Sequence, residues 1–107
     1  MGETIYFYRY VDEDGGGAEI VRVFCVEMPL IEENAISYLV ENKYNIDTEG
    51  VKKWISKVSK EKWAYSTREQ ALESFIKRKQ KQIVILKERI DNEATALSIA
   101  KEMQENN

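Results

Sequence analysis

The order of apolar and polar positions along the chain predicts a strand-rich first part. Residues 4–11 (TIYFYRYV) and 18–27 (AEIVRVFCVE) are rich in β-branched and aromatic side chains, which favour strands. The segment between them, DEDGGGA, contains three glycines that accept positive φ without steric cost. This combination predicts a β-hairpin. Pro29 is expected to end the second strand, because proline cannot serve the interior of a β-ladder.

A third strand is predicted at residues 35–41, where apolar Ile36, Tyr38 and Val40 alternate with more polar positions. The residues that follow it (NKYNIDTEG) have the composition of a loop.

The stretch from residue 51 to residue 66 fits two local structures. Its first apolar residues have the i, i+3, i+4, i+7 spacing of a helix: Val51, Trp54, Ile55 and Val58. Apolar and polar side chains also alternate there, as they do in a strand. Because the run is short and is followed at once by the turn-like KEK, we favour a second hairpin with strands near 52–58 and 62–66. The helical alternative stays open.

The C-terminal part has the signature of one long helix. Thr67 and Gln70 have the spacing of a capping box, and Glu69 lies in the first turn, where the helix dipole favours a carboxylate. From Arg68 to about Gln104 there is no glycine or proline, and a helix of roughly 37 residues would be about 55 Å long. The sequence leaves open a break near 91–93, where Asp91 or Asn92 could cap a second helix.

Apolar residues of this helix form a seam with a near-heptad rhythm. The seam positions step by fours and threes: Leu72, Ile76, Lys79, Ile83, Leu86, Ile90, Ala94 and Leu97. Because the helix is longer than a small sheet, part of it should fold back or pack on another protomer. We predict a homodimer or higher oligomer with Ile83, Leu86, Ile90 and Leu97 at the interface. The charge of Lys79 within the seam indicates a snorkelling stem or a polar position that fixes the helix register.

Together these elements predict an α+β fold. It consists of an antiparallel sheet of four or five strands, beginning with the N-terminal hairpin, and a long C-terminal helix whose seam covers the sheet. The length of 107 residues suits a single domain, 1–107, mainly β over 1–66 and helical over 67–105.

The composition argues against catalysis. The chain has no histidine and one cysteine, which removes a Ser-His-Asp triad, a Cys-His pair and nearly every zinc or iron site. Carboxylates cluster at Asp12 to Asp14 and at Glu32 and Glu33, and both clusters are interpreted as solvated loops. We expect no enzymatic activity, no metal and no cofactor.

The sequence also predicts a cytoplasmic protein without a membrane segment. The N-terminus reaches DEDGGG without the apolar region of a signal peptide, and no apolar run approaches the roughly 18 residues of a membrane-spanning helix. Cys25 lies in an apolar run and is expected to be a small buried core residue, which suits a reducing compartment.

The net charge of −3 hides a strong asymmetry along the chain. Residues 1–50 carry a net charge of −8, residues 52–81 of +7 and residues 82–107 of −2. Residues 52–81 are therefore the part of the chain that best suits binding of an anionic partner. The alternative is a basic face that pairs with the acidic first half.

A candidate binding site lies in this basic third. Aromatic rings stack on bases, whereas cations and the N–H groups of a helix start hold phosphates, so the parts of a nucleotide site are present. The candidate ligand- or partner-binding residues are Trp54, Lys57, Trp63, Tyr65, Thr67, Arg68, Arg78 and Gln82. Arg78 can grip phosphate or carboxylate in a bidentate manner, with Gln82 on the same helix face. The competing interpretation is a core edge, in which Trp63 and Tyr65 are buried and lysine stems snorkel.

Three motifs follow one another between residues 53 and 86: KWISK at Lys53–Lys57, WAYST at Trp63–Thr67 and EQALESFIKRK at Glu69–Lys79. This succession resembles a family of short, uncharacterised bacteriophage accessory proteins that share the pattern KW[IV]SK, WAYxT and ExALxSFxxRK. Members of that family often have proline where this chain has Ser66. The resemblance implies a small factor of host takeover that acts in the host cytoplasm, with inhibition of bacterial defence as a common role.

The predicted function is a non-catalytic binding protein, an anti-defence factor that blocks a host protein or sequesters an anionic nucleotide signal. Two alternatives stay open. One is nucleic-acid binding by the basic band 52–81, which predicts a steep salt dependence but is opposed by the acidic first half. The other is a structural oligomerisation module without a ligand.

Overall fold

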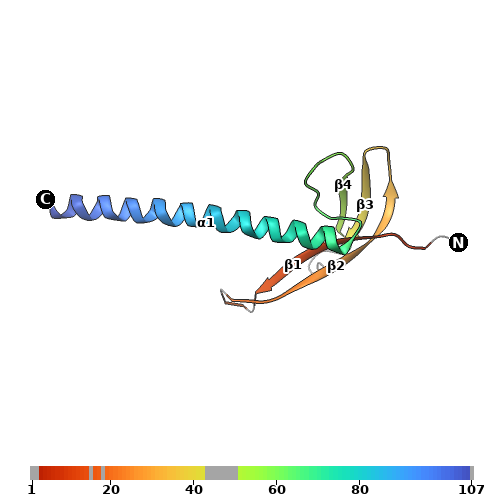
Figure 1. Cartoon of the computed structure of the whole chain (residues 1–107), viewed down its shortest axis with the longest axis horizontal. Helices are drawn as coiled ribbons and strands as arrows, with labels where there is room; N and C mark the ends of the chain where they lie inside the picture. Colours follow the sequence, from red (N-terminus) through yellow and green to blue (C-terminus); the bar gives the residue numbers. More distant parts are fainter. Residues whose placement is uncertain (1–2, 15, 18, 43–50, 107) are drawn as a thin grey trace. The chain divides into compact units, whose positions relative to one another are not determined.

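The computed structural model describes residues 3–14, 16–17, 19–42 and 51–106. Within these residues the chain forms four strands and one helix, in the order β1 (Tyr6–Asp14), β2 (Ile20–Glu33), β3 (Ser37–Asn42), β4 (Val51–Ser56) and α1 (Arg68–Glu105) (Figure 1). The strands form an antiparallel sheet in the order β1-β2-β3-β4. The predicted α+β fold is therefore confirmed.

The predicted N-terminal hairpin is present. β1 and β2 pair from Tyr6 opposite Pro29 to Asp14 opposite Ile20. In the connection between them Gly16 has a φ of 90°, a conformation that L side chains rarely adopt. Glycine at this position lets the chain turn without steric strain.

Pro29 does not end β2, contrary to the sequence-based prediction. β2 continues to Glu33, and its last residues pair with β3, beginning with Leu30 opposite Val40. The Leu30 N–H donates to the Ile5 carbonyl at 2.8 Å, so the Pro29 nitrogen points away from β1. On that other side the ladder with β3 begins only at Leu30, and a residue without an N–H is tolerated there.

β3 confirms the predicted third strand, and β4 confirms the strand predicted near 52–58 over its helical alternative, but the predicted hairpin with 62–66 is wrong. β4 pairs with β3 along its whole length, from Ser56 opposite Ser37 to Val51 opposite Asn42. Residues 62–66 form no strand of the sheet. The loop predicted between β3 and β4 lies almost entirely outside the described residues.

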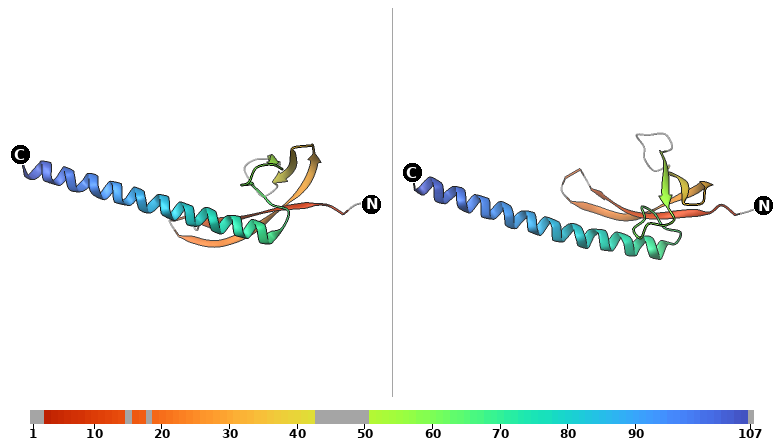
Figure 2. Two further views of the ribbon diagram at one scale, coloured as in Figure 1. Left: turned by 45° about the horizontal axis from the view of Figure 1, so that its top comes forward. Right: turned by 90° about the horizontal axis from the view of Figure 1, so that it is seen from above.

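The segment after β4 does not return along β4 but crosses to β1. The Ser56 hydroxyl oxygen accepts hydrogen bonds from the N–H groups of Val58 and Ser59, at 3.2 and 3.1 Å. Further along, Tyr65 makes an isolated bridge to Tyr8 of β1, with N–O distances of 2.7 and 2.9 Å. Figure 2 shows this segment crossing beside β1 before α1 begins. The partner of Tyr65 is thus the edge of β1, more than fifty residues earlier in the sequence.

The main buried cluster lies on one face of the sheet, whereas buried Leu39, next to Val40 on β3, points to the other face. The buried cluster consists of Phe7, Val26, Met28, Val40, Ile55 and Ala64, with Val11, Phe24, Leu30, Tyr38 and Trp63 packed against it. Cys25 was predicted to be buried but is only half-buried. It pairs with Tyr10 and alternates with the core residues Phe24 and Val26, so it lies on the other face.

α1 begins at the predicted cap. The Gln70 N–H donates to the Thr67 hydroxyl oxygen at 3.2 Å, and Glu69 lies in the first turn. Ala71 and Phe75 are the buried residues of the helix.

α1 continues from Arg68 to Glu105, so the break that the sequence left open near 91–93 is absent. The Thr95 hydroxyl donates to the Asp91 carbonyl at 3.0 Å, a bond to the residue four positions earlier that is typical of a helix interior. Asp91 and Asn92 are therefore interior helical residues and cap nothing.

The contacts within the chain define two units, Met1–Phe75 and Ile76–Asn107, and their boundary falls inside α1. Every side chain from Ile76 to Asn106 is exposed. The predicted burial of the seam is wrong from its first position, because Leu72 is 40% exposed and the buried helical residues Ala71 and Phe75 are not seam positions. No helix in the described part of the chain is long and apolar enough to cross a membrane.

Candidate functional site

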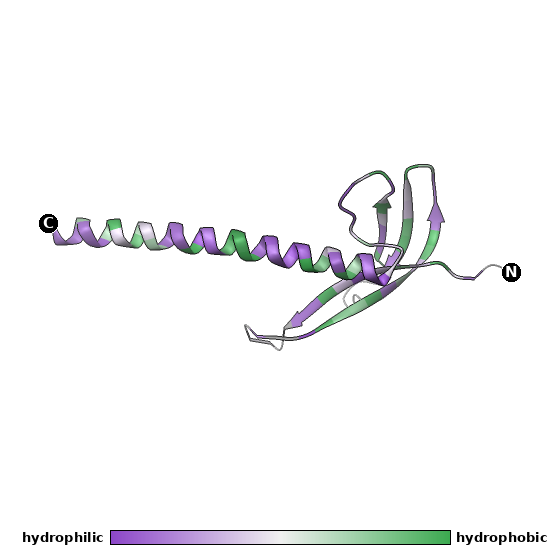
Figure 3. Ribbon diagram, in the orientation of Figure 1, coloured by the Kyte–Doolittle hydropathy of each residue, from purple (hydrophilic) through white to green (hydrophobic). Residues whose placement is uncertain are grey.

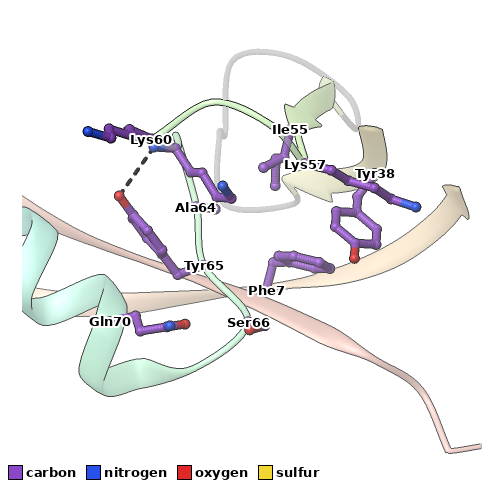
Figure 4. A pocket seen from close by; sticks show the side chains of 10 residues that line it. Phe7, Tyr38, Ile55, Lys57, Lys60, Ala64, Tyr65, Ser66 and Gln70 are labelled. Carbon is purple, nitrogen blue, oxygen red and sulfur yellow. Dashed lines mark hydrogen bonds between the residues drawn. The ribbon is translucent and has the colours of Figure 1, made fainter. Parts of the chain in front are cut away.

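A pocket of about 370 Å³ lies within the first unit (Figure 4). Three strands, the segment after β4 and the start of α1 contribute to it. Its lining consists of Phe7, Tyr38, Ile55, Lys57, Lys60, Lys62, Ala64, Tyr65, Ser66 and Gln70. The volume falls within the range of about 300–1,000 Å³ that is common for small-molecule sites.

Apolar and aromatic side chains of the core form one wall of the pocket. The Phe7 and Tyr38 rings lie against each other, with centroids 4.8 Å apart and planes inclined by 44°. Ile55 and Ala64 are buried beside them. Figure 4 shows the Phe7 and Tyr38 rings on one side and the Tyr65 ring on the other. Because core packing holds most of these groups, the wall is preformed.

Three lysines give the pocket a positive character. The Lys57 ammonium is 2.5 Å from a carboxylate oxygen of Glu33 and 4.6 Å from the centroid of the Tyr38 ring, which fixes its position. The Lys62 ammonium donates to the Ser59 carbonyl at 2.6 Å. Lys60 is exposed. One of these charges is offset by Glu33, so the lining as a whole favours an anion.

Tyr65 places a polar hydroxyl at the pocket. Its oxygen accepts a hydrogen bond from the Lys62 N–H at 3.2 Å, the dashed line in Figure 4. Burial of the ring raises the pKa of Tyr65, but hydrogen bonds from the Ser74 side chain and the Lys62 N–H, with the Lys62 charge, outweigh it. The net pKa of Tyr65 lies below its ordinary value.

The start of α1 adds to the positive character of this region. Ser66 and Gln70 belong to the lining, and the helix dipole places partial positive charge at the first turn. Gln70 adds a side-chain amide that can donate to an anion as well as accept from a sugar or base.

Of the eight residues singled out from the sequence, Lys57 and Tyr65 line the pocket. Thr67 caps the helix beside the pocket, through the bond to Gln70. Arg68 forms an ion pair with Glu27 and lies 5.1 Å from the Tyr8 ring, on the opposite face of the hairpin from Phe7.

The two tryptophans have different environments, and neither lines the pocket. Trp63 packs against the core, and its ring has the Arg9 guanidinium at 4.8 Å and the Lys53 ammonium at 5.4 Å. Arg9 also donates to the Trp63 carbonyl at 2.6 Å. Trp54 pairs with Leu39 on the other face of the sheet and is 48% exposed.

Arg78 and Gln82 belong to the second unit, whereas the pocket lies wholly in the first. Neither residue is among those that line the pocket. Both are exposed side chains of α1.

Sequence reasoning did not single out the aromatic wall. Phe7 and Tyr38 were assigned only to predicted strands, and the pairing of β2 with both β1 and β3 brings them together. In β1 the consecutive residues Tyr6, Phe7 and Tyr8 are all aromatic, so the local pattern does not show which of them faces the core. That pattern alone does not reveal which core residues end at a pocket.

Among the residues that the structure describes, no group of three or more His, Cys, Asp or Glu side chains could hold a metal ion. Comparisons with protein-family models, with curated proteins and with solved structures find no match to this chain.

Proposed function

We propose that this chain is a small binding protein that holds an anionic ligand with a planar ring, such as a nucleotide, in the pocket between β3 and the start of α1. The observation that carries the proposal is the presence of Lys57, Lys60 and Lys62 in the lining of a pocket with an aromatic wall. The aromatic wall suits a planar ring, and the lysines with the helix start suit a phosphate group. Binding of this kind needs no catalytic group.

Sequestration of an anionic nucleotide signal is the role that agrees best with such a pocket. The motifs that resemble those of bacteriophage accessory proteins support a role of this kind in an infected host cell, where removal of a signal would weaken a defence response. The chain would then act in the host cytoplasm and in stoichiometric amounts. Blocking of a host protein would weaken the defence response as well. A nucleotide retained on the purified protein would favour sequestration over blocking.

Nucleic-acid binding by the whole band 52–81 is less favoured by the positions of its charges. Lys52 pairs across the ladder with Glu41, and Lys53 lies over the Trp63 ring. Lys57 is paired with Glu33, and Arg68 with Glu27. Several of these cations therefore already contact groups of the same chain, which leaves fewer of them available to a polyanion.

The test uses the full chain purified from expressing bacteria. Native mass spectrometry should show added mass of nucleotide size on the protein. Calorimetric titration with adenosine monophosphate should then show binding that Lys60→Gln weakens by roughly tenfold, the loss expected for one charge-assisted contact. Lys60 is the side chain to change because Lys57 and Lys62 also hold contacts within the protein.

Lys52→Gln is the matched control. It removes the same charge from the same basic band, but Lys52 does not line the pocket. The pocket model predicts unchanged binding for this variant. Equal loss with both variants, together with a steep dependence on salt and tighter binding of single-stranded DNA, would instead identify the band as a nucleic-acid surface. Absence of both retained mass and titratable binding would contradict the proposal.

A further inference from the structure

The helical unit, Ile76–Asn107, leaves a long apolar seam uncovered. In heptad notation, Ile76, Ile83, Ile90 and Leu97 occupy successive a positions, and Leu86 lies at a d position between them. Their side chains are 44–66% exposed. Figure 3 shows hydrophobic residues of α1 as green bands among hydrophilic ones.

A single helix of this kind gains little stability from its own residues. Helices in proteins are held mainly by packing of an apolar face, and no side chain from Ile76 to Asn106 is buried. The seam extends over three heptads, which is about 32 Å at 1.5 Å per residue. Heptads sustained over this length are typical of a coiled coil, so the expected occupant is another helix with the same spacing.

The charges within the seam select the occupant and its direction. Lys79 and Glu93 also occupy d positions, and each lies seven residues from Leu86, on opposite sides of it. In a parallel, in-register pair of identical helices, Lys79 would face Lys79 and Glu93 would face Glu93, and both contacts are repulsive. In an antiparallel pair centred near Leu86, each Lys79 comes within about one helical turn of Glu93 on the other copy.

The same antiparallel arrangement matches the apolar positions. In such a pair the a positions of one helix pack beside the d positions of the other, so Ile83 comes beside Leu86 of the second copy and Ile76 comes within about one helical turn of Leu97. We infer that two copies of this chain associate through the helical unit, as an antiparallel coiled coil held by this seam and by two symmetric Lys79–Glu93 pairs. A polar pair inside an apolar seam fixes register and direction more than it adds stability. The proposal does not depend on the pocket, which lies in the first unit.

Charge exchange in the full-length protein tests both the association and its direction. Sedimentation equilibrium should show a dimer for the native chain. Lys79→Glu and Glu93→Lys should each weaken the dimer by about tenfold, because each turns two attractive contacts into repulsive ones. The double variant K79E/E93K restores opposite charges at both contacts and should recover the native dissociation constant.

Lys81→Glu is the matched control, because it reverses the same charge at position f, on the side of the helix away from the seam. It should leave the dissociation constant within about twofold of the native value. A native chain that stays monomeric at high micromolar concentration would overturn the proposal. So would single variants that dimerise like the native chain while the native chain and the double variant form mixed dimers, because that pattern is expected of parallel helices.

Discussion

The sheet unit, Met1–Phe75, and the helical unit, Ile76–Asn107, contain the same kinds of apolar side chain but cover them differently. Met28 and Val40 are completely buried in the sheet unit, whereas Ile83 and Ile90 in the helical unit are 51% and 66% exposed. The sheet brings together residues that are far apart in sequence. A lone helix brings together only residues within about one turn, and it cannot enclose its own apolar side.

The two units therefore differ in what stabilises their folded structure. The sheet unit contains its own core, and the candidate pocket is built entirely from that unit. Its binding capacity should therefore not require a second copy. The helical unit has the pattern of an interface without the partner that would bury it, so its stability should depend on protein concentration.

The boundary between the units can be tested at two adjacent residues of α1. Phe75 is 9% exposed and Ile76 is 47% exposed. Phe75→Ala should lower the free energy of unfolding of the sheet unit by about 3 kcal/mol, because it removes a buried aromatic side chain. Ile76→Ala should change it by less than about 1 kcal/mol at concentrations where the chain is monomeric. Urea unfolding followed by tryptophan fluorescence measures both, and similar losses would contradict the proposed boundary.

The cap at the start of α1 should matter more than the cap-like residue in its middle. Thr67→Ala removes the oxygen that accepts the Gln70 N–H and should cost about 1 kcal/mol. Asp91→Ala should cost nothing measurable, because Asp91 lies inside the helix and alanine is the better helix former. Thermal unfolding followed by circular dichroism compares the two variants. A larger loss for Asp91→Ala would indicate that a second helix begins there.

The smallest expected effect concerns the pH dependence of the sheet unit. The lowered pKa of Tyr65 means that the folded state favours the phenolate more than the unfolded state does. This contribution to stability is therefore absent at neutral pH. It grows as the pH rises through the folded-state pKa and is complete above the unfolded value of about 10. A difference titration of phenolate absorbance between the native chain and Tyr65→Phe should show one phenol with a midpoint below about 10.

Signals that act over a few residues could be read from the sequence, whereas pairings across the fold could not. The Thr67–Gln70 cap, the glycine-rich turn and the strand character of β1 to β4 depend on neighbouring residues. The continuation of β2 beyond Pro29 and the bridge from Tyr65 to Tyr8 depend on which strand edge is vacant. Local patterning carries no information about that choice.

The same limit applies to the candidate site: residues marked by their local sequence could be identified, and residues brought together only by the fold could not. Lys57 and Tyr65 were found because they lie in a basic and aromatic stretch of sequence. Phe7 and Tyr38 were not, because only the order of the strands makes them neighbours. Arg68 was assigned to the site by its position in the sequence, but its side chain is directed to Glu27 and Tyr8.

Amide hydrogen exchange at two protein concentrations would separate the self-contained unit from the partner-dependent one. We predict that amides of β1 to β4 exchange at the same slow rate at both concentrations. Amides of α1 from Ile76 to Glu105 should be protected at the higher concentration and should lose most of their protection on dilution. Equal protection of these helical amides at both concentrations, in a chain shown to be monomeric at the lower one, would contradict the view that a second copy holds the helical unit.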